Sequence, residues 1–143
     1  MSVSISIEIS LSKQISRMTI LRKLEDFGWS YNDQGKVTYL PIGDDNDFNW
    51  RSKSIPLEEL LKILVIKDNK RELIGVAMTW KDTDVGGTFL IEENGTILMS
   101  PDINRKVLDV ESYNKITDVN WYATKLIPVF GQLFESISYN EHV

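Results

Sequence analysis

The sequence predicts an α+β fold in which a mainly antiparallel sheet of about five to seven strands packs against helices, with a long C-terminal helix. Three patterns lead to this prediction. Apolar and polar residues alternate at the N-terminus, apolar residues recur at helical spacing in three later segments, and the turn dipeptide Asn94-Gly95 joins two strand-like runs. We expect residues 1–143 to form a single globular domain.

Composition limits the class of protein. A chain of 143 residues with 42% hydrophobic and 10% aromatic residues can bury a core without disulfides or a structural metal. The absence of Cys excludes thiol catalysis, thiolate zinc sites and any argument for an oxidising compartment. The N-terminus lacks the pattern of a signal peptide, and no segment is apolar enough to span a bilayer. We therefore expect a cytoplasmic protein without membrane contact.

The first two elements follow from local periodicity. Residues 3–9 alternate apolar with polar side chains, which predicts a half-buried strand. Apolar residues then recur at every third position from Ile15 to Phe27, which predicts a helix. Ser12 is the expected N-cap, and Gly28 is the expected C-terminal stop.

The middle of the chain should contain a hairpin, a second helix and a three-stranded meander. Turn residues at 32–35 lie between two short strand-like runs, which is typical of a hairpin. Pro56 and an apolar stripe predict a helix that ends near Lys67. The strands expected in the meander are residues 73–80, 88–92 and 96–99. A further short strand is expected around residues 106–110.

The last segment should be the long helix, capped by Thr117 or Asp118. Helical spacing places a core stripe on one side of it and places Pro128 and Trp121 on the other side. The residues of the predicted stripe are Val119, Tyr122, Ala123, Leu126, Phe130, Leu133, Phe134 and Ile137.

Negative charge is concentrated in two segments. Residues 43–50 and 82–102 are rich in carboxylates and contain no Lys or Arg, whereas residues 51–81 between them hold seven Lys and Arg against four Asp and Glu. The net charge of −5 is therefore unevenly distributed. A concentrated negative field attracts cations or a basic protein and repels nucleic acid.

Catalytic motifs are mostly missing from the sequence. The single histidine, His142, is the penultimate residue, and Gly86-Gly87 lacks the Gly-Lys-Ser/Thr ending of a phosphate-binding loop. Residues 82–93 nearly follow the spacing of a calcium loop, but Gly86 stands where an oxygen ligand is expected and strands flank the segment. We therefore expect no catalytic residue, no metal site and no cofactor, and we expect that the protein is not an enzyme.

The aromatic residues beside the acids suggest a binding face. Aromatic anchors supply much of the energy of protein interfaces, and surrounding charges guide encounter and select the partner. An alternative is that these aromatics fill the core and the acids cap loops. The predicted partner-binding residues are Asp44, Asp45, Asp47, Phe48, Trp50, Asp82, Asp84 and Trp121.

Three segments carry a family resemblance: residues 116–122, the Gly-Trp-Ser-Tyr-Asn sequence at 28–32, and the stretch 39–44. They resemble features of small immunity proteins encoded beside bacterial polymorphic or contact-dependent growth-inhibition toxins. The resemblance implies a cytoplasmic antitoxin that binds one cognate toxin domain, often a basic nuclease, and blocks its active site. It transfers no functional residue, because each such pair has its own interface.

Two other classes of function stay open. One is a small enzyme that uses a pair of carboxylates, with or without a divalent metal, and the other is a self-associating structural module. The sequence does not define the oligomeric state, the activity of a toxin, or whether an inhibitor would cover the toxin's active site or another surface.

Overall fold

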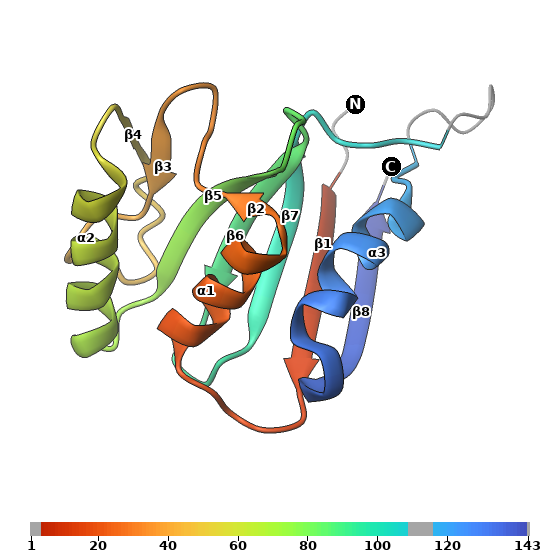
Figure 1. Cartoon of the computed structure of the whole chain (residues 1–143), viewed down its shortest axis with the longest axis horizontal. Coiled ribbons are helices and arrows are strands. Elements are labelled where there is room, and N and C mark those ends of the chain that lie inside the picture. The colour runs from red at the N-terminus through yellow and green to blue at the C-terminus, as the bar shows by residue number, and fades with distance from the viewer. Residues whose placement is uncertain (1–3, 109–115, 143) are drawn as a thin grey trace.

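The computed structural model describes residues 4–108 and 116–142, and within them an eight-stranded antiparallel sheet carries three α-helices on one face (Figure 1). The predicted α+β class with a mainly antiparallel sheet is confirmed, although the expected number of strands was too low. The strands are β1 (Ser4–Leu11), β2 (Trp29–Ser30), β3 (Val37–Tyr39), β4 (Arg51–Lys53), β5 (Ile74–Trp80), β6 (Gly86–Ile91), β7 (Ile97–Ile103) and β8 (Phe134–His142). The helices are α1 (Arg17–Phe27), α2 (Leu57–Asn69) and α3 (Val119–Phe130).

The strand order is β4-β3-β5-β6-β7-β1-β8, and β2 pairs with β5 beside this path. The N-terminal strand β1 therefore lies between β7 and the C-terminal strand β8, which joins the two ends of the chain in one sheet. The meander β5-β6-β7 is confirmed, and Gly95 in its second turn adopts φ +89°, a conformation that glycine accepts without strain.

Helix α1 begins later than predicted. Ser16, and not Ser12, is the N-cap, and its hydroxyl accepts a hydrogen bond from the Thr19 amide. Gly28 ends the helix as expected, with φ +136°. In α2, Pro56 occupies the N-cap position and the helix continues two residues past Lys67, to Asn69.

The predicted hairpin at 29–40 forms its turn but not its strand pair. Asp33 and Lys36 form a bridge, yet β2 and β3 both pair with β5 and not with each other. Sequence periodicity could not show this, because either arrangement satisfies the same local pattern.

The predicted long C-terminal helix is wrong in its extent. Asp118 caps α3 as expected, and Pro128 is exposed, but the helix ends at Phe130. The chain turns at Gly131, where φ is +54°, passes through the short 3₁₀ helix η2 (Gly131–Leu133) and returns as β8. Phe134 and Ile137, expected on the helix, lie in that strand, where Ile137 and Tyr139 alternate with Ser136 and Ser138.

Residues 109 and 110 of the short strand expected near 106–110 lie outside the described residues, and Val107 makes only an isolated bridge to Thr117. Within the described ranges, no helix has the length and apolar character required to cross a membrane.

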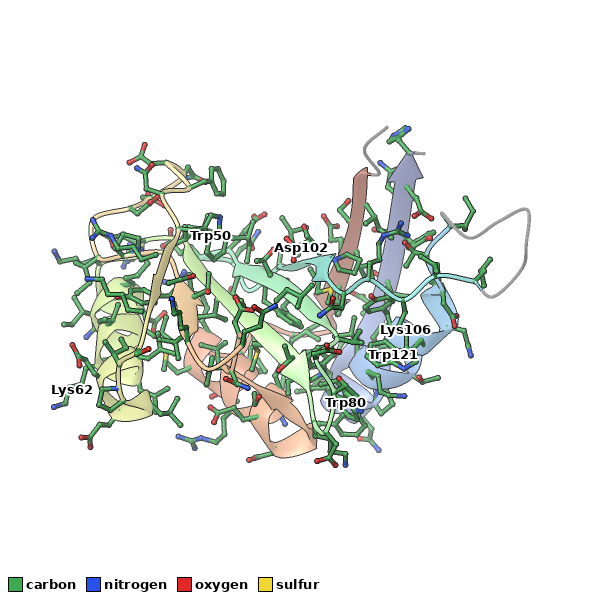
Figure 2. The ribbon with its side chains drawn as sticks, turned by 90° about the horizontal axis from the view of Figure 1, so that it is seen from above. Trp50, Lys62, Trp80, Asp102, Lys106 and Trp121 are labelled. Carbon is green, nitrogen blue, oxygen red and sulfur yellow. The ribbon has the colours of Figure 1, made fainter. Side chains whose placement is uncertain are left out.

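The two faces of the sheet differ in composition. The face under the helices carries the core, in which strand residues such as Ile7, Val76, Phe89 and Met99 form one buried cluster with Leu24 of α1. The opposite face carries no helix in the part of the chain that the structure describes, and we call it the open face (Figures 1 and 2). Any candidate site on the open face is therefore built from strand side chains and from the loops that border the sheet.

Candidate functional site

Strand residues on the open face are mostly small, hydroxylated or acidic, with Leu90 and Leu98 as apolar exceptions. Cross-strand register places Leu98 beside Glu8 and Leu90, and it places Ser100 beside Thr88. Three carboxylates, Glu8, Glu92 and Asp102, continue the same alternation, whereas no described strand residue that points to this face is Lys or Arg. The other described residues of this face are Ser6, Ser10, Ser30, Thr38, Ser52, Gly75, Ala77, Thr79, Gly86, Ser136, Ser138, Asn140 and His142.

The 43–50 loop borders one end of the open face, and its conformation depends on Asp44. This side chain is only 4% exposed. Its carboxylate accepts backbone hydrogen bonds from Asp47 at 2.9 Å, Phe48 at 3.1 Å and Asn49 at 2.7 Å. Burial tends to raise the pKa of Asp44, but these three N–H groups and the charge of Lys67 together hold it below its usual value. Asp44 therefore shapes the loop and does not present its charge to a partner.

Lys67 anchors the same loop from α2. Its side chain is fully buried, and its ammonium donates to the carbonyl oxygens of Pro41 at 2.8 Å and Asp44 at 2.7 Å. A third contact, at 3.2 Å, is an ion pair with Glu72, whose carboxylate also accepts from the Gly43 amide. Burial tends to raise the pKa of Glu72, and the Gly43 amide and Lys67 lower it below the usual range. The loop is thus fixed at its start by a buried charge network.

The exposed part of the loop meets the end of the meander in a groove of about 390 Å³. Leu73, Leu90 and Leu98 line it, Phe48 lies at its side with 47% of its surface exposed, and Asp45, Glu92 and Glu93 supply carboxylates. Arg71 is the one cation among the described lining residues, and its contact with Glu93 at 3.7 Å is exposed on both sides. We call this feature the acidic groove, and its lining is completed by Asn46.

Two residues of the loop hold a backbone conformation that side chains disfavour. Asn46 has φ +75° and Phe48 has φ +57°. For an aromatic residue such a conformation is unusual, and it persists only where surrounding contacts determine it. The hydrogen bonds to Asp44 provide those contacts, and they hold the Phe48 ring at the rim of the groove.

Trp50 ends the loop on the open face. A Cβ at Gly75 would lie 2.8 Å from the Trp50 ring and 2.7 Å from Leu40, so the absence of a side chain at Gly75 lets the indole pack against the sheet. Figure 2 shows Trp50 and Asp102 on one side of the sheet, and Trp80 and Trp121 on the other. The predicted aromatic residues are therefore divided between the two faces.

The second acidic segment lies at the far end of β5. The Leu73 amide, next to the start of β5, donates to Asp45 at 3.0 Å, whereas Asp82 and Asp84 follow the end of that strand. Seven strand residues separate the two loops by roughly 20 Å. Asp82 and Asp84 are exposed. The distance between the loops does not favour the expectation that they contact a partner as one compact face.

The rings of Trp80 and Trp121 lie beside cations. The Lys125 ammonium lies 5.5 Å from the Trp80 ring and 5.1 Å from the Trp121 ring, and Lys81 lies 5.4 Å from the Trp80 ring. Trp80 also packs against Phe27 and Trp29, so it belongs partly to the core. Trp121 is half-buried, and its ring meets Tyr122 edge-on.

Asp102 is the one carboxylate of the described strands with a raised pKa. Burial by its neighbours raises the pKa, the nearby charge of Asp33 adds to the effect, and a 3.0 Å hydrogen bond from Thr88 works against it. Among the described residues, no group of three or more His, Asp or Glu side chains is placed to hold a metal ion. His142 lies exposed at the end of β8.

The sequence reasoning did not assign the groove's other members to a site. Glu92 and Glu93 were noted for their charge, but Leu90, Leu98 and Arg71 were not singled out. The sequence feature that could have identified Leu90 and Leu98 is the Asn94-Gly95 turn. This turn fixes the register of β6 and β7 and hence pairs Leu90 with Leu98 on the face opposite the core. Nothing in the sequence connects that pair with Phe48.

The chain matches no protein-family model, and no curated protein or solved structure matches it.

Proposed function

We propose that the protein is a non-enzymatic bacterial immunity protein that binds a cognate basic toxin domain through its open face and 43–50 loop, and so blocks the toxin. The observation that carries the proposal is charge segregation on the open face. Among the described strand residues that point there, Glu8 and Asp102 are carboxylates and none is Lys or Arg, and the acidic groove adds Asp45, Glu92 and Glu93 against Arg71. Such a field favours a cationic partner and speeds association with it.

The acidic groove supplies an apolar contact beside the charge. Phe48, Leu90 and Leu98 offer a surface for the carbon stem of a Lys or Arg, and Asp45, Glu92 and Glu93 lie around it for the charged end. Aromatic and apolar anchors surrounded by charge are typical of protein interfaces. Because Lys67 and Asp44 already fix the loop, binding would require little ordering of this segment.

The decisive experiment uses the native genome. A neighbouring reading frame should encode a domain with a basic surface that is toxic when expressed alone and harmless when this chain is co-expressed. The purified pair should form a 1:1 complex by calorimetry. If the neighbouring products show no toxicity that this chain relieves, and no binding, the proposed function is wrong.

The surface itself is tested by paired charge removal. Asp45→Asn with Asp47→Asn should slow association several-fold at low salt and much less at high salt, because exposed charges act mainly on the rate of encounter. The amide oxygen introduced at position 45 can still accept from the Leu73 amide, so the fold is retained. The matched control, Asp82→Asn with Asp84→Asn, removes the same charge at the other end of β5. Equal slowing by the two pairs would show that net charge, and not the groove, guides binding.

A further inference from the structure

The two edges of the sheet differ in length and charge. Strand β4 at one edge is three residues long, and two of them, Arg51 and Lys53, are cationic. Strand β8 at the other edge is nine residues long and contains neither Lys, Arg nor Pro. Short length and cations are the usual means by which an edge strand avoids pairing with another chain. In the described structure, β4 has these features and β8 does not.

Glu141 does not block the edge of β8, and Glu135 lies at the bulge near the start of the strand. The Glu141 carboxylate is turned toward Arg105 and Thr117 and is only 6% exposed. It accepts from the Thr117 hydroxyl at 2.7 Å and from the Tyr139 hydroxyl at 2.6 Å, and it pairs with Arg105 at 3.4 Å. Ser136, Ser138 and Asn140 point to the open face and carry no charge. The stretch 136–140 therefore presents a neutral edge with an unpaired backbone in the described sheet.

We propose that β8 pairs antiparallel with β8 of a second copy of this chain, with the twofold axis at Ile137, so that the two sheets become continuous. This register places Ile137 opposite its own copy and Ser136 opposite Ser138 of the second copy. A β-bulge between Phe134 and Ser136 interrupts the register at that end of β8, so the regular part of the pair is centred on residues 136–138. Across the two strands the apolar Ile137 side chains face each other and serines face serines, and no like charges oppose each other.

Neighbouring registers are less complementary. Because side chains alternate along a strand, the open faces of both copies stay on one side only when the register between the two strands changes by two residues. Such a change moves the twofold axis by one residue. Centring the pair on Ser138 would bring Glu135, at the bulge, close to Glu141 of the second copy, and centring it on Tyr139 would place Ile137 opposite Glu141. The dimer would extend the acidic open face across both copies, but it does not depend on the proposed toxin-binding function.

The register can be tested by charge pairs. Ser136→Lys with Ser138→Lys would place Lys opposite Lys twice across the axis, whereas Ser136→Lys with Ser138→Glu would place Lys opposite Glu twice. Sedimentation equilibrium of the wild-type chain should show a reversible monomer–dimer equilibrium. The Lys/Lys variant should weaken dimerisation about tenfold, and the Lys/Glu variant should restore it.

A control variant, Ser6→Lys with Ser10→Lys, carries the same added charge on β1, one strand away from the edge. It should weaken the dimer much less than the Lys/Lys variant does, and circular dichroism should show the same fold for all variants. A wild-type chain that stays monomeric at millimolar concentration overturns the proposal. Equal weakening by the Lys/Lys and Lys/Glu variants, or by the control, overturns it as well.

Discussion

The 43–50 and 81–85 loops are both rich in Asp but are held differently. Both lie at ends of β5 and both are rich in carboxylates. The 43–50 loop is fixed by buried Lys67 and by three backbone bonds to Asp44. The 81–85 loop is a short turn, closed by hydrogen bonds from Thr83 to Trp80 and from Asn104 to Asp84. Lys81 is its first residue, and the Lys125 ammonium lies 5.5 Å from the ring of the preceding residue, Trp80.

This difference shows that acidic residues close together in the sequence do not necessarily form an acidic surface on the folded protein. One of the acids in the 43–50 loop is buried as a structural acceptor, and the groove beside the loop gains its other carboxylates from the β6–β7 turn. The 81–85 loop keeps its charge exposed, but cations lie at its border. The comparison between the two loops can be tested by substitutions that should affect them unequally.

The largest effect is expected from Lys67→Met. It leaves the Glu72 carboxylate without its ion pair and removes the donor to the carbonyl oxygens of Pro41 and Asp44. Loss of one partner of a buried ion pair destabilises by about 3–5 kcal/mol. Chemical denaturation would measure the loss, with Lys62→Met as the control, because Lys62 is an exposed residue of the same helix (Figure 2). Comparable losses in the two variants would refute the anchoring role of Lys67.

A smaller effect, with a pH signature, is expected from Asp44→Asn. The new amide group would face a backbone N–H in place of an acceptor oxygen, which costs about 1–3 kcal/mol. The folded pKa of Asp44 lies below the ordinary value of 3.8. The stability that its ionised form contributes is therefore complete above pH 3.8 and is lost as the pH falls through the folded pKa.

Unfolding titrations between neutral and acid pH would show this difference. The wild-type chain should lose stability in that acid range, and the Asp44→Asn variant should lose less, because it no longer has the ionised group. Glu72 and Glu141, whose pKa values are also lowered, keep part of the slope in both proteins. A variant with the same slope as the wild type would contradict the assignment to Asp44.

The smallest effect is expected from Asp82→Asn with Asp84→Asn. Neither side chain takes part in a hydrogen bond or ion pair within the described residues, and both are exposed. The free energy of unfolding should change by less than about 0.5 kcal/mol. Thermal unfolding would detect a larger change, and a loss comparable to that of Asp44→Asn would mean that both loops are structurally anchored.

Much of the fold could be predicted from local signals. The glycine after α1, the Asp118 cap, and the Asn94-Gly95 turn each act within a few residues, and each lies where the sequence indicated. The C-terminal helix was predicted too long because helical spacing continued by chance through Phe134 and Ile137. Gly131 and the alternation of Ile137 and Tyr139 with serines were the competing signals.

The candidate site depended more on tertiary structure. Asp45, Phe48 and Trp50 were identified from the sequence, and the structure places them along the open face and its groove. The burial of Asp44, the anchoring by Lys67 and the separation of Asp82 from the groove arise from contacts between distant segments, which local composition does not encode.

The sequence by itself determined the α+β class, the meander and the helix caps, because the patterns behind them span only a few neighbouring residues. Only the tertiary structure decided which acids share a surface, which Trp residues meet cations, and which strand lies at the edge. Those relations depend on sheet order and register, and these result from burying one apolar face across the whole chain.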